Sequence, residues 1–502
     1  MDRLIASLGI VTAPGVYDGI VPRLRLKCRL FCSDTCMKTL TILELEYKND
    51  TSLYFEHFIH LPYPCFLDSS LFDGKQAVCK DHSSRYDIMT AAPERHFTFT
   101  TDGDLIIEDL VQQKTEILSA AEPFSQLSNR LHHMSKVDNA GLPFVGGMVG
   151  FWGYELCEHL EPGRIAHRDI STPLMSVGLY QWALISDHKE RRACLVFHPD
   201  ISASWKTDIL KAIDPTRRQS GSSPFKLLNK FTPTQTPAEY QSAFQQIQDY
   251  ITAGDCYEVN LTQRFTAPFS GNAWEAFKKL RTVAKAPYSA FISRPDLTIL
   301  SHSPEQFIRL EHGHVSTKPI KGTRPRGRTA EEDRAIAEEL QHSQKDQSEN
   351  LMIVDLLRND LGKVCKTGTV SVPRLFALES YANVHHLVST IKGQLKCDHD
   401  AFDLLRSTFP GGSITGAPKI RSMEIIRELE PVARTVYCGS IGYISCDGNM
   451  DTSITIRTIL AKDGELHCWG GGAIVADSDC ESEYQESITK VRNLMNTLET
   501  FL

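Results

Sequence analysis

Residues 307–320 read FIRLEHGHVSTKPI, and this stretch indicates the class of fold. Two short runs flank Glu311-His312-Gly313, which is the pattern of two β-strands joined by a tight, glycine-containing turn. Outward from this hairpin, the chain alternates irregularly between further hairpins and helices. It lacks the regular strand–helix–strand order that a parallel sheet requires, so we expect an α+β fold.

The best-marked helix of the chain is predicted to begin at Pro237. Thr236 and Glu239 have the spacing of a capping box, and proline suits the first turn of a helix. Gly254 supplies the stop signal. Residues 258–265 then alternate between apolar and polar side chains, which predicts a strand with two different faces.

The composition is that of an ordinary globular chain, with 502 residues, of which 41% are hydrophobic and 23% charged. The length exceeds one typical domain. A net charge of −8 argues against nucleic acid or anionic membranes as partners, because both need a basic surface. We find no export signal and no apolar run near the roughly 20 residues needed to span a bilayer. We therefore expect a cytoplasmic protein whose 14 cysteines are reduced.

Glu305 and Lys321 form the first candidate pair of catalytic groups. If a hairpin joins their segments, the two side chains approach one another across neighbouring strands. A lysine beside a carboxylate in a shielded pocket can act as base or nucleophile while the acid delivers a proton. The alternative is a solvated basic turn, because Lys318, Arg324 and Arg326 crowd the same stretch.

Two acidic doublets form the second candidate site. Asp346 and Glu349 are three residues apart, so a helix places them on one face, and the apolar run LMIVDLL that follows predicts a buried helix. Buried carboxylates need compensating charge, which a divalent cation can supply. Glu483 and Glu486 repeat the spacing, although for that helix taken alone an exposed face with a Glu486–Lys490 pair is the simpler interpretation.

Residues 410–419, PGGSITGAPK, form a glycine-rich turn that leads into an amphipathic helix. Gly411 and Gly416 have the separation of a phosphate-binding loop. However, Ala417 stands where the lysine of such a loop must be, so we exclude nucleotide binding. The free amides at a helix N-terminus can still hold a carboxylate.

Taken in order, these segments resemble the chorismate-utilising enzymes, a family that includes anthranilate, aminodeoxychorismate, isochorismate and salicylate synthases. The resemblance is carried by GDCYEVNLTQRF, PIKGTRPRG, SENLMIVDLLRNDL, HLVSTIKG, FPGGSITGAPKIRSMEII and GGGAIVADSDCESEYQESITKV. It implies two packed, largely antiparallel β-sheets with helices on the outer faces. It also implies an N-terminal lobe over 37–213, a linker over 214–236 and a chorismate-binding catalytic domain over 237–502. Residues 1–36 fall outside the resemblance, and we interpret them as an extension or a mis-called start.

The residue after Pro319-Ile320 separates the branches of this family. Anthranilate synthases are expected to carry alanine there and the aminodeoxychorismate branch lysine, and this chain has Lys321. The resemblance implies that Lys321 attacks chorismate at C2 with Glu305 as general acid, and that ammonia then adds at C4. The product would serve 4-aminobenzoate and folate biosynthesis. The rival readings are an anthranilate synthase component I, an isochorismate or salicylate synthase, and a non-catalytic tryptophan-binding scaffold.

The resemblance also assigns binding positions. The expected ligands of Mg²⁺, which would hold the ring carboxylate, are Asp346, Glu349, Glu483 and Glu486. The positions expected to bind substrate are Arg457, Tyr437, Lys490, His386, Ser413 and Gly472. A tryptophan pocket is expected from Ser69, Arg85, Tyr86, Pro287, Tyr288, Ser289 and Phe291. Ala473 departs from a glycine of the family pattern. We find no G-x-C-x-G segment, so ammonia is expected from a separate glutamine amidotransferase subunit.

Overall fold

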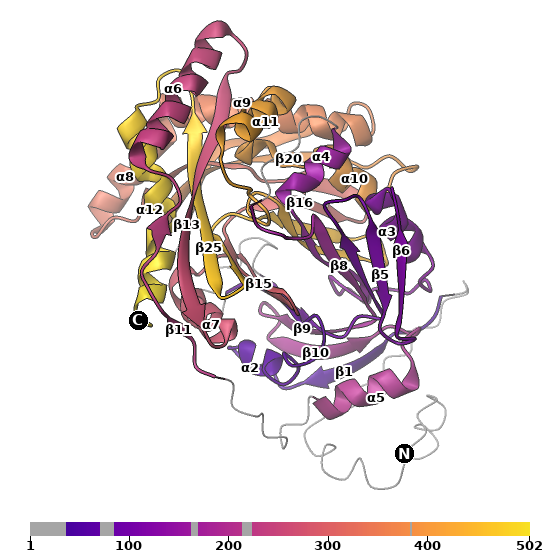
Figure 1. Cartoon of the computed structure of the whole chain (residues 1–502). Coiled ribbons are helices and arrows are strands. Elements are labelled where there is room, and N and C mark those ends of the chain that lie inside the picture. The colour runs from indigo at the N-terminus through magenta and orange to yellow at the C-terminus, as the bar shows by residue number, and fades with distance from the viewer. Residues whose placement is uncertain (1–36, 71–84, 162–168, 213–222, 382–383) are drawn as a thin grey trace.

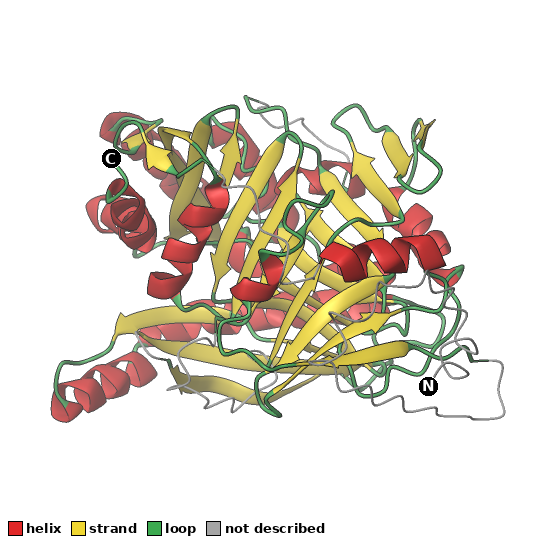
Figure 2. Ribbon diagram, turned by 90° about the horizontal axis from the view of Figure 1, so that it is seen from below, coloured by secondary structure: helices red, strands yellow, loops and turns green. Residues whose placement is uncertain are grey.

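The computed structural model describes residues 37–70, 85–161, 169–212, 223–381 and 384–502. Two large β-sheets form the centre of the molecule and helices lie around them (Figures 1 and 2). The named strand pairs of the described residues are all antiparallel. The predicted α+β class and the two-sheet arrangement are therefore confirmed. The predicted extension over residues 1–36 lies outside the described residues.

The first sheet has 13 strands and runs from the N-terminal part of the chain into the C-terminal part. Its order is β1 (Thr41–Leu45), β10 (Arg192–Phe197), β9 (Trp182–Asp187), β3 (Tyr86–Thr90), β2 (Cys65–Asp68), β14 (Tyr288–Arg294), β15 (Leu297–Ser303), β24 (Thr458–Lys462), β25 (Glu465–Ile474), β13 (Glu258–Ser270) and β11 (Lys226–Leu227). The short strands β12 (Thr232–Pro233) and β21 (Gly416–Ala417) also pair with β13.

The second sheet has 12 strands. Its order is β18 (Ile320–Pro325), β20 (Val384–Gln394), β17 (His314–Thr317), β16 (Gln306–Glu311), β23 (Met450–Ile454), β22 (Ser440–Ser445), β7 (Gly147–Trp152), β8 (Met175–Tyr180), β4 (Arg95–Phe99), β5 (Leu105–Asp109) and β6 (Lys114–Leu118), and β19 (Ser371–Ser380) pairs with β20. The segments 37–213 and 237–502 thus each contribute strands to both sheets, so the two predicted units share a single pair of sheets.

The helices lie mainly at the periphery (Figure 2). They are α2 (Ser52–Phe55), α3 (Pro123–His132), η3 (Tyr154–Leu156), α4 (Cys157–Leu160), α5 (Ala203–Ala212), α6 (Pro237–Ala253), α7 (Ala273–Ala284), α8 (Ala330–His342), α9 (Gln344–Val364), α10 (Ala401–Thr408), η4 (Gly412–Ile414), α11 (Lys419–Leu429) and α12 (Cys480–Glu499). In Figure 1, α6 and α12 lie beside the long strands β13 and β25. In the part of the chain that the structure describes, no helix is long and apolar enough to cross a membrane.

The core is divided by the sheets. One large cluster lies between them and includes Trp152 and Phe97 from the second sheet with Ile299 from the first. Another cluster covers the outer side of the first sheet, where Trp274 of α7 and Leu498 of α12 are buried. Burying both faces of the sheet removes a large apolar area from water, which is the main stabilising contribution to such a fold.

The local sequence signals are confirmed where they were clearest. Thr236 and Glu239 form the capping box of α6, and Gly254 adopts the left-handed conformation with φ of 82°. The predicted hairpin consists of β16 and β17, in which Leu310 pairs with Val315.

Candidate active site

Lys321 lies in β18 with its ammonium group buried against Glu258, the first residue of β13. The Nζ–Oε1 distance is 2.8 Å, and the two residues are 9% and 0% exposed. Burial alone lowers the pKa of Lys321, but the carboxylates of Glu258, Glu349 and Glu305 more than offset this effect and the pKa is raised. The lysine is therefore held protonated when no substrate is bound.

Glu305 lies between β15 and β16 and is 4% exposed. The hydroxyl of Ser413 donates a hydrogen bond to its Oε1 at 2.8 Å. Burial raises the pKa of Glu305 to about 7, although the Ser413 bond and the charge of Lys321 oppose the rise. A carboxyl group that titrates near neutral pH can both donate and accept a proton under physiological conditions.

The approach of Glu305 and Lys321 is confirmed, but its expected geometry is wrong. They do not face one another across neighbouring strands, because β17 and β20 lie between β16 and β18 in the sheet. They meet instead near the ends of their strands, where the backbone N–H of Ile320 bonds to the Glu305 carboxylate. The β16–β17 hairpin reverses the chain direction, but β20 pairs between β17 and β18 and so determines the position of β18 in the sheet.

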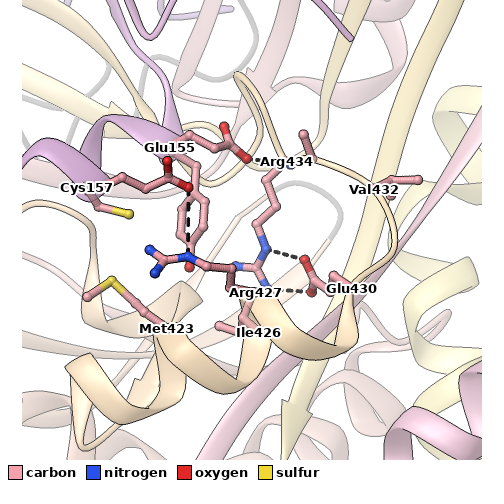
Figure 3. A pocket seen from close by; sticks show the side chains of 11 residues that line it. Glu155, Cys157, Met423, Ile426, Arg427, Glu430, Val432 and Arg434 are labelled. Carbon is pink, nitrogen blue, oxygen red and sulfur yellow. Dashed lines mark hydrogen bonds and ion pairs between the residues drawn. The ribbon is translucent and has the colours of Figure 1, made fainter. Parts of the chain in front are cut away.

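The loop that carries Ser413 is fixed by a buried arginine. Arg434 donates to the carbonyl oxygens of Ile414 and Asn260, each at 2.9 Å, and to both oxygens of Glu430, at 2.8 and 2.7 Å. Figure 3 shows this pair at a small pocket between α11 and the η3–α4 segment. Because Ile414 follows Ser413 directly, the Arg434 contacts position the hydroxyl that bonds to Glu305.

The same pocket holds a second buried acid, Glu155 of η3. Its Oε1 accepts hydrogen bonds from the backbone N–H groups of Arg434 at 2.8 Å and Thr435 at 3.2 Å. Burial raises the pKa of Glu155 to about 7. These bonds tie the N-terminal part of the chain to the segment behind the Ser413 loop.

Three of the four predicted metal-binding acids surround one lysine. Lys345 of α9 lies 3.3 Å from Glu483, and the charges of Glu483, Glu349 and Glu486 raise its pKa against the opposing effect of burial. Burial raises the pKa of Glu349 to about 7. The fourth acid, Asp346, accepts a hydrogen bond from Arg324 at 3.1 Å.

Gly472 and Lys490 lie beside the acids of α12. A Cβ atom on Gly472 would come within 3.1 Å of Glu483 and 3.7 Å of both Glu486 and Lys490. Lys490 pairs with Glu486 at 2.8 Å, as the simpler reading of this helix predicts, and its Nζ also donates to the Gly471 carbonyl at 2.9 Å. The exposed Glu486–Lys490 pair therefore lies beside Gly472 and Glu483, among the positions predicted to bind substrate and metal.

The predicted metal-binding acids of α9 and α12 are chemically suited to a hard divalent cation, although their side chains do not converge on one point. Carboxylate oxygens on α9 and α12 are the donors that Mg²⁺ prefers, and Mg²⁺ commonly keeps several waters. Among the described residues, no three His, Cys, Asp or Glu side chains converge as metal ligands would. The ammonium group of Lys345 instead provides positive charge between the two helices.

Two of the predicted substrate-binding residues lie close together. Burial lowers the pKa of His386 to about 3, and the nearby charge of Arg457 contributes to this shift. The low pKa keeps the ring neutral, and a hydrogen bond between the Thr323 hydroxyl of β18 and Nδ1 of His386, at 2.8 Å, orients it. No carboxylate in the described segments pairs with Arg457, whose pKa is lowered by burial. A partly buried guanidinium of this kind is suited to an anionic ligand.

Tyr437 is buried and stacks on Trp469, with ring centroids 6.0 Å apart. Its charged neighbours are Arg434 and Glu430. The backbone N–H of Tyr437 also donates to the Arg434 carbonyl at 2.9 Å, so this residue lies beside the Arg434–Glu430 pair.

The residues predicted to form a tryptophan pocket fall on both faces of the first sheet. Ser289 bonds to Ser70 and His302, and Phe291 packs on Trp274 of α7, so both face the outer side. Ser69 donates to Asp87, and Arg85 forms an ion pair with Asp187 at 2.7 Å.

Tyr288 and Tyr86 face the interior between the sheets. The buried hydroxyl of Tyr288 has no hydrogen-bond partner among the described groups, and its charged neighbours are Asp451 and Arg309. Asp451 pairs in register with Tyr443, and burial raises its pKa to about 6. This aromatic site with one buried carboxylate suits an amino acid that has a ring and an ammonium group.

Three groups that the structure places at these sites were not predicted from the sequence: Glu258, Arg434 and Asp451. Glu258 carried one weak signal, its position on the polar face of a predicted strand. Arg434 and Asp451 carried none, because each is defined by partners from distant segments.

The arrangement is that of an enzyme site with a buried lysine, a carboxyl group that titrates near pH 7, and free positive charge for an anion. A family model described as chorismate binding enzyme matches residues 75–496. The chain belongs to this family.

Similar proteins within the family include both aminodeoxychorismate and anthranilate synthase components. Aminodeoxychorismate synthase component 1 of Salmonella typhimurium is 44% identical over 92% of this chain and 100% of its own length. Anthranilate synthase component 1 of Aquifex aeolicus is 35% identical over 77% of this chain and 81% of its own. The crystal structure of anthranilate synthase component I from Streptococcus pneumoniae superposes with a TM-score of 0.73 at 31% identity, covering 84% and 94% of the two chains. Both activities thus occur among similar proteins, and the site must discriminate between them.

Proposed function

We propose that this chain converts chorismate and ammonia to 4-amino-4-deoxychorismate, the precursor of 4-aminobenzoate for folate. The observation that carries the proposal is the lysine at position 321, buried 2.8 Å from Glu258 and close to Glu305. If Lys321 belonged only to a solvated basic turn, its side chain would be exposed to solvent. The extent of similarity to aminodeoxychorismate synthase component 1, over 92% of this chain, supports the same assignment.

In the first step Lys321, once neutral, attacks C2 of the ring and its nitrogen forms a bond to carbon. The double bond shifts and the C4 hydroxyl leaves as water with the proton of Glu305. In the second step ammonia attacks C4, the carbon–nitrogen bond to Lys321 breaks, and Glu305 accepts a proton from the incoming nitrogen. Splitting the displacement into two steps explains why the amino group ends at C4.

The substrate carries two carboxylates, and the site offers positive charge for each. Arg457, beside the neutral ring of His386, is the group for one of them. Magnesium bound by the acids of α9 and α12, with Lys490 adjacent, would hold the ring carboxylate. Burial of Glu305 limits the access of water and favours its protonated form, which supplies the proton for the leaving group.

The ammonia source that we propose is a separate glutamine amidotransferase subunit, since the relatives are named as one component of a synthase. We further propose that L-tryptophan binds between the sheets at Tyr288, with Asp451 as the partner of its ammonium group. These two proposals are independent of the chemistry at Lys321.

The experiment is product identification after incubation of the purified protein with chorismate, Mg²⁺ and ammonium. Lys321→Ala is the test variant, and Lys392→Ala, an exposed lysine on the neighbouring strand β20, is the matched control. We expect aminodeoxychorismate from the wild type and the control, and a loss of at least about a thousandfold in Lys321→Ala, as for removal of a covalent nucleophile. Fluorescent anthranilate from the wild type would contradict the proposal.

A further inference from the structure

We propose that Glu258 is the general base that removes the proton from Lys321 and so generates the nucleophile. The inference rests on the proposed function and adds a catalytic residue to it. The Glu258 carboxylate is the group in hydrogen-bond contact with the lysine, with 2.8 Å between Oε1 and Nζ. Its second oxygen, Oε2, is buried and has no hydrogen-bond partner among the described groups.

A base is needed because the resting lysine is charged. An ammonium group has no lone pair to form a bond to carbon, so the proton must leave before attack. Once substrate fills the site, water has poor access to a lysine that is 9% exposed. The proton must therefore pass to a group inside the protein.

The other carboxylates around Lys321 are committed to different tasks. Glu305 must carry a proton for the leaving hydroxyl. Glu349 of α9 and Glu486 of α12 face the lysine from the side of the proposed metal site. Glu258, which is fully buried and held by β13, remains as the acceptor.

The transfer is balanced and physically accessible. The ion pair Lys321-NH₃⁺ and Glu258-COO⁻ becomes the neutral pair Lys321-NH₂ and Glu258-COOH, with no proton exchanged with solvent. Burial penalises both charges of the ion pair, so the neutral pair lies closer in free energy than it would in water. When ammonia displaces the lysine, the amine leaves neutral and recovers its proton from Glu258.

This mechanism has a signature in the pH dependence. In the wild type the proton passes directly from Lys321 to Glu258 over 2.8 Å, so forming the nucleophile needs no net proton release to solvent. In Glu258→Gln the amide keeps the size of the side chain but accepts no proton, and Lys321 must release its proton to solvent. The ratio of variant to wild-type kcat/KM for chorismate then rises about tenfold per pH unit, or about a hundredfold from pH 6 to pH 8. Taking the ratio cancels the titration of Glu305 and of ammonia.

The experiment measures kcat/KM for chorismate with ammonium between pH 6 and pH 9 for the wild type, Glu258→Gln and Glu258→Asp. We expect the rising ratio for Glu258→Gln, and a ratio for Glu258→Asp that is below 1 but independent of pH, because a carboxylate is retained. If Glu258 only holds the lysine charged, its removal lowers the pKa of Lys321, and the ratio instead exceeds 1 at low pH. A ratio for Glu258→Gln that is constant with pH, or one for Glu258→Asp that also rises, would overturn the proposal.

The same measurements distinguish a failure of the proposed function from a failure of the proposed role of Glu258. A wild-type enzyme that yields no aminodeoxychorismate refutes the proposed function. A wild-type enzyme that yields it, together with a ratio for Glu258→Gln that does not rise with pH, refutes only the role of Glu258.

Discussion

Replacing Ser413 by alanine should move the pH dependence of the enzyme by a predictable amount. The Ser413 hydroxyl donates to a buried carboxylate at 2.8 Å, and a hydrogen bond to a charged group contributes about 1.5–3 kcal/mol. The bond stabilises the charged form of Glu305, so its loss raises the pKa from about 7. At about 1.4 kcal/mol per pKa unit, the rise is roughly 1–2 units.

The assay is the pH profile of kcat/KM for chorismate at constant free ammonia. In the proposed mechanism Glu305 acts in its protonated form, so the rate falls on the alkaline side as the group ionises. In Ser413→Ala this fall should occur roughly 1–2 pH units higher. Ser440→Ala is the matched control, since its buried hydroxyl donates to the Ser453 carbonyl at 3.0 Å and to no carboxylate. An alkaline limb that stays in place, or moves to lower pH, would show that Glu305 is not the acid or that Ser413 does not control it.

Three further predictions concern other parts of the molecule. Burial raises the pKa of Glu155 to about 7, so the wild type should lose stability as the pH rises from about 4.5 to 7. Glu155→Gln avoids this loss, and its unfolding free energy should exceed that of the wild type by up to about 3 kcal/mol at pH 8 but by little at pH 4.5. Urea unfolding that gives the same difference at both pH values would contradict this prediction. Lys345→Met removes an ammonium group 3.3 Å from Glu483, and this group repels a metal ion bound by the same acids. The variant should therefore bind Mn²⁺ about 3–10-fold more tightly, as measured by electron paramagnetic resonance. Unchanged or weaker binding would show that Lys345 does not oppose the metal ion. Asp451→Asn should weaken tryptophan binding at least about tenfold in calorimetry with little effect on turnover, and equal affinity would place the amino group elsewhere.

The sequence alone determined the features that depend on neighbouring residues. Thr236 and Glu239 bond within one helical turn, so the start of α6 is visible in the chain itself. The hairpin of β16 and β17 is equally local, since Glu311 and His314 lie at its turn. The family was also evident, because the motifs that contain Lys321 and the paired acids occur in an ordered series along the chain.

The tertiary structure decided which charges meet. Lys321 and Glu258 are far apart in the chain and became partners because β18 and β13 come together at one site. Arg434 reached Ile414 and Asn260 for the same reason, by packing α11 and its following loop against β13. Local patterns fix φ and ψ over a few residues, whereas burial and the crossing of distant strands determine a pKa. The sequence therefore predicted Lys321 as a candidate nucleophile, whereas its buried partner Glu258 was found only in the tertiary structure.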